Sequence, residues 1–239
     1  MYAFKASGIN KSYGSKKVLI DFSISLEQGL IHALIGPNGA GKTTFVKSLL
    51  NLIAIDSGEI TIFDQSWKNE KTHSRIAFIP EKFNFYSYYT PATTVKFLCQ
   101  MHGVKDDQIK SKLGEALEKF DLSKIKNQKI STISKGQLQR IALSYIYICG
   151  PDFIILDEPF SGLDPIGMKE LKDFLVDLRQ SGKTVFINSH MLSEVEKICD
   201  EVTIINEGKA VISGKLSEIT QQKNLEEYFY QKIKDNKGK

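Results

Sequence analysis

The sequence feature that most constrains the fold is a glycine-rich segment, Gly36 to Thr43, which reads Gly-Pro-Asn-Gly-Ala-Gly-Lys-Thr. It follows an apolar run, Ile31–Ile35, and precedes a helix-like segment that starts near Lys42. A phosphate-binding loop (P-loop) has this pattern, with a strand before it and a helix after it. Small residues let the backbone wrap a polyphosphate, and the helix N-terminus attracts the same anion. The alternative is a glycine-rich turn that only caps a helix, and the preceding strand argues against it.

Two side chains of this loop have predicted roles. The lysine of a P-loop, here Lys42, reaches the β- and γ-phosphates, and the hydroxyl of the next residue, Thr43, binds Mg²⁺. A P-loop alone predicts a bound nucleotide and leaves open which kind of protein uses it.

The composition is that of a soluble globular protein. Of the 239 residues, 41% are hydrophobic and 25% are charged, which allows one large domain or a core with a subdomain. We expect no membrane span, because no apolar run approaches the roughly 18 residues required, and no secretion signal near the N-terminus. The net charge of +4 is compatible with anionic ligands or a membrane surface and is diagnostic of neither. Three widely separated cysteines suggest neither a disulfide framework nor a zinc site.

Short apolar runs separated by helical segments predict an α/β fold of the P-loop NTPase type with a parallel core sheet. The candidate core strands are Ile31–Ile35, Ile76–Ile79, Phe153–Leu156, Thr184–Asn188 and Val202–Asn206. Partly alternating runs predict an N-terminal antiparallel β subdomain, with strands Tyr2–Ser7, Lys17–Leu26 and Glu59–Phe63. A long helical stretch, roughly 93–149, predicts an inserted helical subdomain.

These segments set the expected domain organisation. We expect a single domain over residues 1–220. Its β subdomain and nucleotide-binding core take up 1–82 and 151–220, and its helical subdomain about 83–150. Residues 221–239 read as a polar tail, which we expect to be frayed.

Two acidic residues, Asp157 and Glu158, directly follow the predicted strand Phe153–Leu156. In open α/β sheets, ligands gather at the carboxyl ends of the strands. An aspartate at this place helps to hold Mg²⁺ in P-loop NTPases, and Glu158 can then act as general base for an attacking water. The alternative is two solvated acids at a strand–turn junction. For this segment alone the two interpretations are equally supported, and the P-loop upstream favours the metal-binding one.

The segment Ile133-Ser-Lys-Gly-Gln137 opens a further predicted helix. Ser134 can cap that helix, and backbone N–H groups near Gly136 are available to an anion. From this segment alone, an ordinary helix cap without a ligand is the favoured interpretation.

The order of these motifs resembles the ATP-binding-cassette (ABC) ATPases. After the P-loop come Ser-Lys-Gly-Gln at 134–137, Leu-Asp-Glu-Pro at 156–159, Ser-Gly-Leu-Asp at 161–164, and His190. The resemblance covers nearly the whole chain, and the combined set of motifs is highly specific to that family.

The resemblance implies roles for the residues around the nucleotide. Tyr13 matches the aromatic residue that stacks on adenine. Asp157 matches the metal-binding aspartate, Glu158 the catalytic base, and His190 the histidine that touches the γ-phosphate. The residues that match the phosphate loop are Gly36, Pro37, Asn38, Gly39, Ala40, Gly41, Lys42, Thr43 and Thr44.

Two further segments are implied to act across a dimer. The signature segment matches the family's binding site for the γ-phosphate held by the opposite subunit, and it comprises Ser134, Lys135, Gly136 and Gln137. The crossing loop, Ser161–Asp164, matches the loop at the dimer interface, and we include Asp164 among the nucleotide-site residues.

The chain departs from the family pattern at two positions. Lys135 stands where the signature usually has a second glycine. Glu81 stands where most cassettes have a glutamine that binds the metal, and its carboxylate adds negative charge near the phosphates. A carboxylate can still hold a metal-bound water, so Glu81 stays a candidate metal ligand. Both departures resemble exporter-type cassettes.

The function implied by the resemblance is that of the ATP-hydrolysing subunit of an ABC transporter, more often an exporter than an importer. The implied ligands are ATP and Mg²⁺, and the implied partners are a second cassette, identical or not, and a separate membrane subunit. An aromatic run over residues 83–89 is expected to contact that subunit. We expect a cytoplasmic protein held at the inner face of the cell membrane.

Two other classes of function are weighed against this one. A soluble ABC-type ATPase acting on DNA or ribosomes requires a long coiled coil or a second cassette, and the sequence has neither. No clustered basic face points to nucleic acid. A small-molecule kinase with the same P-loop should lack the segments 134–137 and 161–164.

Overall fold

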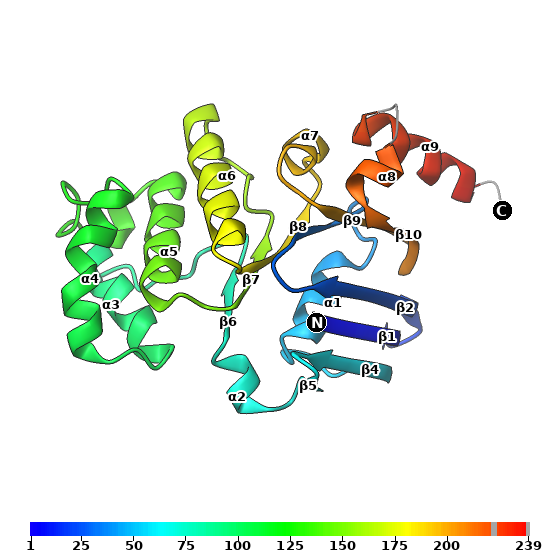
Figure 1. The fold of residues 1–239 in the computed structure, drawn as a ribbon, viewed down its shortest axis with the longest axis horizontal. Helices are drawn as coiled ribbons and strands as arrows, with labels where there is room; N and C mark the ends of the chain where they lie inside the picture. Colours follow the sequence, from blue (N-terminus) through cyan, green and yellow to red (C-terminus); the bar gives the residue numbers. More distant parts are fainter. Residues whose placement is uncertain (221–223, 238–239) are drawn as a thin grey trace.

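The computed structural model describes residues 1–220 and 224–237, which build two β-sheets with helices packed around them (Figure 1). The larger sheet has six strands in the order β10-β9-β3-β8-β7-β6, and neighbouring strands are parallel except for β10 and β9. Its strands are β3 (Ile31–Ile35), β6 (Ile76–Ile79), β7 (Phe153–Asp157), β8 (Thr184–Ser189), β9 (Glu201–Asn206) and β10 (Lys209–Lys215). The predicted parallel core sheet is confirmed.

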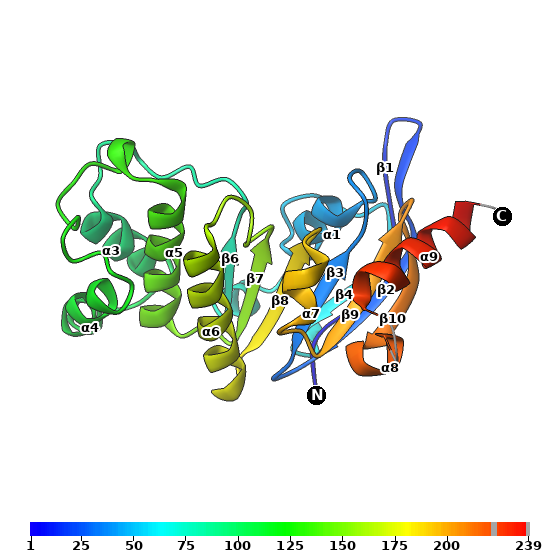
Figure 2. The same cartoon turned by 90° about the horizontal axis from the view of Figure 1, so that it is seen from above.

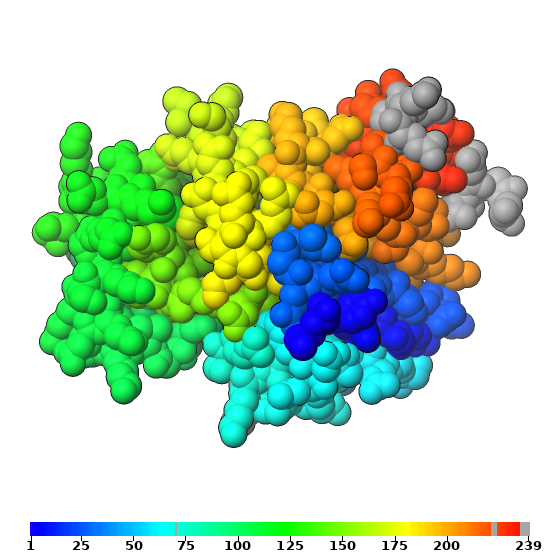
Figure 3. Space-filling model, viewed as in Figure 1, coloured from blue at the N-terminus to red at the C-terminus, as the bar shows by residue number. Residues whose placement is uncertain are grey.

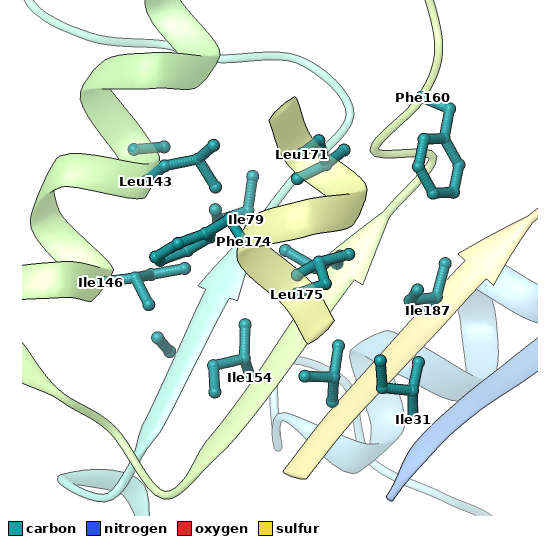
Figure 4. Close-up of a cluster of buried hydrophobic side chains, with 14 of the residues drawn as sticks. Ile31, Ile79, Leu143, Ile146, Ile154, Phe160, Leu171, Phe174, Leu175 and Ile187 are labelled. Atoms are coloured by element: carbon teal, nitrogen blue, oxygen red, sulfur yellow. The ribbon is translucent and has the colours of Figure 1, made fainter. Parts of the chain in front are cut away.

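The parallel strands are continuous apolar runs because both faces of this sheet are covered. In β7, Phe153 and Ile155 join one buried cluster, and Ile154 and Leu156 join the other. Figure 4 shows the second cluster, in which side chains of α6 (Pro165–Gln180) lie over β7 and β8.

The smaller sheet is antiparallel, in the order β2-β1-β4-β5, and confirms the predicted β subdomain. Two of its strands, β1 (Tyr2–Tyr13) and β2 (Lys16–Glu27), extend beyond the predicted ranges at their ends. The strand β4 (Ser57–Ile62) starts two residues earlier and ends one residue earlier than predicted, and β5 (Gln65–Ser66) was not predicted. The helix α1 (Lys42–Leu49) is buried between the two sheets. The ring centroid of Phe45 in α1 lies 4.9 Å from that of Phe22 in β2 and 6.1 Å from that of Phe186 in β8. This one side chain therefore contacts both sheets. This packing fixes the helix that the P-loop enters.

The inserted helical subdomain forms one end of the elongated molecule (Figures 2 and 3). The predicted long stretch is divided into α3 (Pro91–Met101), α4 (Asp106–Lys119), the short 3-10 helix η1 (Ile130–Thr132) and α5 (Lys135–Cys149). Thr90 caps α3 by accepting a hydrogen bond from the N–H of Thr93 at 3.2 Å, and Pro91 occupies the first turn.

Three further helices are short: α2 (Glu70–His73), α7 (Leu192–Glu196) and α8 (Leu216–Thr220).

The C-terminal region contains a helix where the sequence predicted a frayed tail. This helix, α9, spans Leu225–Lys237. Leu225 is fully buried, and its N–H donates a hydrogen bond to Glu196 Oε1 at 3.0 Å. The polar composition of α9 gave little sign of this anchor, in which Leu225 and a distant carboxylate hold the start of the helix and Tyr228, Phe229 and Ile233 also pack against the core. Part of the predicted tail, 221–223 and 238–239, lies outside the described residues.

Candidate functional site

The P-loop leaves the carboxyl end of β3 and enters α1. Gly39 and Gly41 have φ of 80° and 113°, in the left-handed region that glycine adopts without strain. A Cβ at Gly36 would lie 2.3 Å from the carbonyl oxygen of Ile205, so only glycine fits there. Gly41 is the N-cap of α1 and offers no side-chain acceptor, which leaves N–H groups of the first turn to bind an anion.

Lys42 is buried inside this loop, with only 7% of its surface exposed. Its Nζ donates hydrogen bonds to the carbonyl oxygens of Gly36 at 2.7 Å and Pro37 at 3.3 Å. Burial lowers the pKa of Lys42, and the negative charges of Glu158 and Asp157 act in the opposite direction. The structure therefore places the lysine ammonium beside the two carboxylates that the sequence singled out.

Three acidic residues lie near the edge where β6 and β7 end, and the charges of two of them act on the third. Asp157 closes β7 and is 8% exposed, Glu158 follows it, and Glu81 follows β6 at the next residue but one. Burial raises the pKa of Asp157, and the charges of Glu158 and Glu81 raise it further. Mutual repulsion among such groups is relieved by a cation, and carboxylate oxygens are ligands that Mg²⁺ prefers.

Glu158 is held by the segment that follows β8. Its Oε2 lies 2.8 Å from His190 Nδ1 and accepts hydrogen bonds from the His190 N–H at 3.3 Å and from the Ser189 hydroxyl at 3.4 Å. Its backbone has φ of 50°, a strained value for a residue with a side chain, and its N–H donates to the Asn188 carbonyl at 2.7 Å. The carboxylate is thus fixed in one orientation beside a histidine whose side chain is 57% exposed.

Asn188 is a site residue that the sequence analysis missed. It is 1% exposed, pairs with Asp157 across β8 and β7, and donates a hydrogen bond from Nδ2 to Asp157 Oδ1. Its own Oδ1 has no hydrogen-bond partner among the described residues. The amide therefore holds the Asp157 carboxylate in a fixed position. A polar residue at the end of a predicted buried strand was the only available signal in the sequence.

The signature segment does not join this cluster within one chain. It opens α5, which lies apart from α1 in both ribbon views, with β6 and β7 between them (Figures 1 and 2). Ser134 caps α5 as predicted: the Gln137 N–H donates to Ser134 Oγ at 3.3 Å, and the Ser134 N–H donates to Gln137 Oε1 at 3.0 Å. Asp164 caps α6 by accepting from the Gly167 N–H at 2.7 Å.

Tyr13 lies at the end of β1, with 51% of its surface exposed, near Lys11 Nζ at 5.5 Å from the ring centroid. His32, inside β3, is 1% exposed and hydrogen-bonds Thr203 at 2.8 Å and Glu201 at 3.1 Å, as expected of a packed core residue. Around the P-loop, Thr43 is exposed and Thr44 is partly buried.

A cavity of about 420 Å³ lies beside the P-loop and His190. The C-terminal helix α9 contributes to its wall through Glu226, Phe229 and Tyr230. No local sequence pattern predicts this contact, because it depends on how α9 packs.

Comparison with known proteins identifies the family. Residues 19–161 match the family model described as ABC transporter. The chain belongs to this family. It is the ATP-binding subunit of an ABC transporter and an ATPase, as the resemblance predicted.

Relatives and solved structures agree with this assignment. The chain is 34% identical over 229 residues to the lantibiotic transport ATP-binding protein SrtF of Streptococcus pyogenes, covering 96% of each chain. It is 35% identical to the bacitracin transport ATP-binding protein BcrA of Enterococcus faecalis, covering 91% of this chain and 71% of that protein. A structure described as the ATP binding subunit of an ABC transporter superposes with a TM-score of 0.89 at 26% identity, covering 97% and 99% of the two chains.

None of the helices within residues 1–220 and 224–237 combines the length and the apolar character that a membrane-spanning helix needs.

Proposed function

We propose that this ATPase subunit works as a pair, with each ATP bound between the P-loop of one copy and the signature segment of the other. The observation that supports this is the separation of the two segments within one chain, at α1 and at the start of α5. Each offers helix N–H groups to phosphate, so each is half of a binding site. A second copy related by a two-fold axis completes both sites at once.

In this pair, different residues at the edge of the core sheet carry out different steps of ATP hydrolysis. Lys42 and the N–H groups of the P-loop stabilise the negative charge that develops on the phosphates. Glu158 accepts the proton of the attacking water, and His190 fixes the orientation of that carboxylate. Tyr13 stacks on the adenine ring. Loss of the γ-phosphate removes the contact between the copies and opens the pair.

We further propose that ATP binds together with Mg²⁺. The oxygen ligands available are the Thr43 hydroxyl and the carboxylates of Asp157 and Glu81, which suit this ion. When bound, the ion neutralises charge on the β- and γ-phosphates. The proposal is supported by the negative charges of Glu158 and Glu81 acting on Asp157, a buried aspartate whose own charge is disfavoured by burial.

The membrane subunit is proposed to dock on a groove of about 370 Å³ beside α3, and transport is proposed to run outward. The groove is lined by the aromatic run predicted for partner contact, including Phe83, Phe85, Tyr86 and Tyr89. Tyr86 and Tyr88 are 51% and 66% exposed with ring centroids 5.7 Å apart, and adjoining exposed aromatic side chains mark a partner contact better than scattered ones do. The direction is supported by the lantibiotic and bacitracin transport proteins among the relatives.

The test of the paired mechanism is the variant Glu158→Gln. It keeps the size of the side chain and removes the base, so hydrolysis should fall by a hundredfold or more, about the contribution of general base catalysis. ATP and Mg²⁺ should then convert the variant from monomer to dimer in size-exclusion chromatography. In the control Lys42→Ala, ATP should produce no dimer. Hydrolysis at the native rate by Glu158→Gln would overturn the assignment of the base.

The docking groove and the direction are tested with the membrane subunit itself. Tyr86→Glu should abolish co-purification of the two subunits and leave ATP binding intact. Transport by inverted membrane vesicles, in which the ATPase faces the medium, should carry the cargo into the vesicle lumen if the system is an exporter. Uptake only by right-side-out vesicles would mark an importer.

A further inference from the structure

The helix α5, which begins at the signature segment, also contacts the crossing loop (Ser161–Asp164) of the same chain. Lys135 Nζ donates a hydrogen bond to the Ser161 hydroxyl at 3.3 Å. The methylene chain of Lys135 lies along Gly162: a Cβ placed there would be 3.1 Å from Lys135 Cδ and 3.3 Å from Nζ. Gly162 has φ of 73°, so this position needs glycine for its backbone and has no side chain to push the lysine away.

Two more contacts join α5 to the same stretch of chain. Gln139 is 5% exposed, and its Nε2 donates to the carbonyl oxygen of Pro159 at 2.7 Å. Leu163 Cδ2 lies 3.7 Å from the position of a Cβ on Gly136. The contacts at 159, 161–162 and 163 follow one another along the segment that leads from Glu158 to α6. The start of α5 and the crossing loop are therefore held together as one unit.

Of these contacts, only that of Lys135 uses a charged group, the ammonium that donates to the Ser161 hydroxyl. The capping box of Ser134 and Gln137 fixes the first turn of α5, so the lysine projects from a rigid base. Its ammonium reaches the loop of its own chain, and its stem covers Gly162. A glycine, which is usual at this position in the family, has no side chain that can make either contact.

We propose that Lys135 is a positioning residue that locks the crossing loop to the signature helix, and that it serves ATP hydrolysis through this contact in place of a direct bond to phosphate. This inference rests on the paired mechanism proposed above. Both segments must meet the partner copy at the same time. Fixing them to each other before contact removes a conformational cost from assembly of the pair.

The test is a double-mutant cycle between Lys135 and Ser161. Lys135→Met keeps most of the stem and removes the ammonium, and Ser161→Ala removes the acceptor. Each should lower kcat by about three- to tenfold, the range expected for one side-chain hydrogen bond. KM for ATP should change less than twofold, because the P-loop of the same chain binds the nucleotide. The double variant should be no slower than the slower single variant, since both remove one interaction.

The controls separate this role from charge and from folding. Lys129→Met removes an equal charge from an exposed position of the helical subdomain and should leave kcat unchanged. Lys135→Arg keeps a donor of similar reach and should retain most of the rate. The melting temperatures of all variants should agree within about 2 °C, since an exposed contact of this kind contributes little to stability.

Three results would overturn the inference. The first is multiplicative loss in the double variant, which would mean that Lys135 acts on the phosphate independently of Ser161. The second is an unchanged kcat in Lys135→Met, and the third is an equal loss in Lys129→Met. None of these would affect the paired mechanism, whose own test is dimer formation by Glu158→Gln.

Discussion

Asn188 allows a sharp prediction, because its loss should impair hydrolysis without unfolding the protein. The variant Asn188→Leu has the same number of side-chain heavy atoms with the same branching, and it removes the amide that donates to Asp157 Oδ1. Asp157 is a proposed Mg²⁺ ligand, and residues that orient a metal ligand typically contribute ten- to a hundredfold to metal affinity or activity, or about 1.4–2.7 kcal/mol. That range agrees with the roughly 1.5–3 kcal/mol of a hydrogen bond to a charged group.

The effect of Asn188→Leu on stability should be much smaller, because two terms of similar size oppose each other. Losing the donor leaves a buried carboxylate less well satisfied, at a cost of about 1–3 kcal/mol. The same change removes the Asn188 Oδ1, a buried acceptor without a partner among the described residues, which should recover a similar amount. We therefore expect a change in the free energy of unfolding within about 1 kcal/mol.

The assay is ATP hydrolysis as a function of Mg²⁺ concentration, paired with urea unfolding of the same preparation. The concentration of Mg²⁺ for half-maximal rate should rise by about ten- to a hundredfold in Asn188→Leu. The reasoning is refuted if that concentration and the maximal rate both match the native protein. A loss of several kcal/mol in unfolding would show instead that the amide serves mainly to hold the sheet together.

Three further predictions concern stability. Phe4→Ala empties a fully buried position against the ring of Phe186 and should cost about 3–5 kcal/mol, lowering the melting temperature by about 6–20 °C in calorimetry; a drop under 3 °C would contradict it. The hydrogen bond from Lys172 holds the pKa of Glu194 below its ordinary value, so its contribution is present above that value and is lost as pH falls through the folded pKa. Glu194→Gln should thus cost about 1–3 kcal/mol in urea unfolding at pH 7 and much less at pH 3, and an equal loss at both would be inconsistent with this. Gly208→Ala places a Cβ 2.4 Å from the Val18 carbonyl oxygen, at a residue with φ of 77°. It should lower the free energy of unfolding by at least about 1–3 kcal/mol in denaturant titration, and an unchanged free energy would contradict this.

Much of the core was readable from the sequence, because its signals are local. Ile31–Ile35 and Ile76–Ile79 match their predicted ranges, since a strand buried on both faces must be a continuous apolar run. The cap of α5 at Ser134 was also predicted, because a capping box is written in four consecutive residues. The acids Asp157 and Glu158 were placed correctly by the rule that ligands gather at the carboxyl ends of parallel strands.

What the sequence by itself determined is the presence of each chemical group, namely the glycine-rich loop, the paired acids Asp157 and Glu158, and His190, together with the family to which the chain belongs. The tertiary structure alone decided which groups touch. Asn188 holds Asp157 only because β7 and β8 pair in that register, and Lys135 meets Ser161 only because α5 packs against the crossing loop. Helix α9 is anchored by Leu225 and a carboxylate 29 positions away. Contacts between residues far apart in the chain leave no local pattern, so they become visible only once the chain is folded.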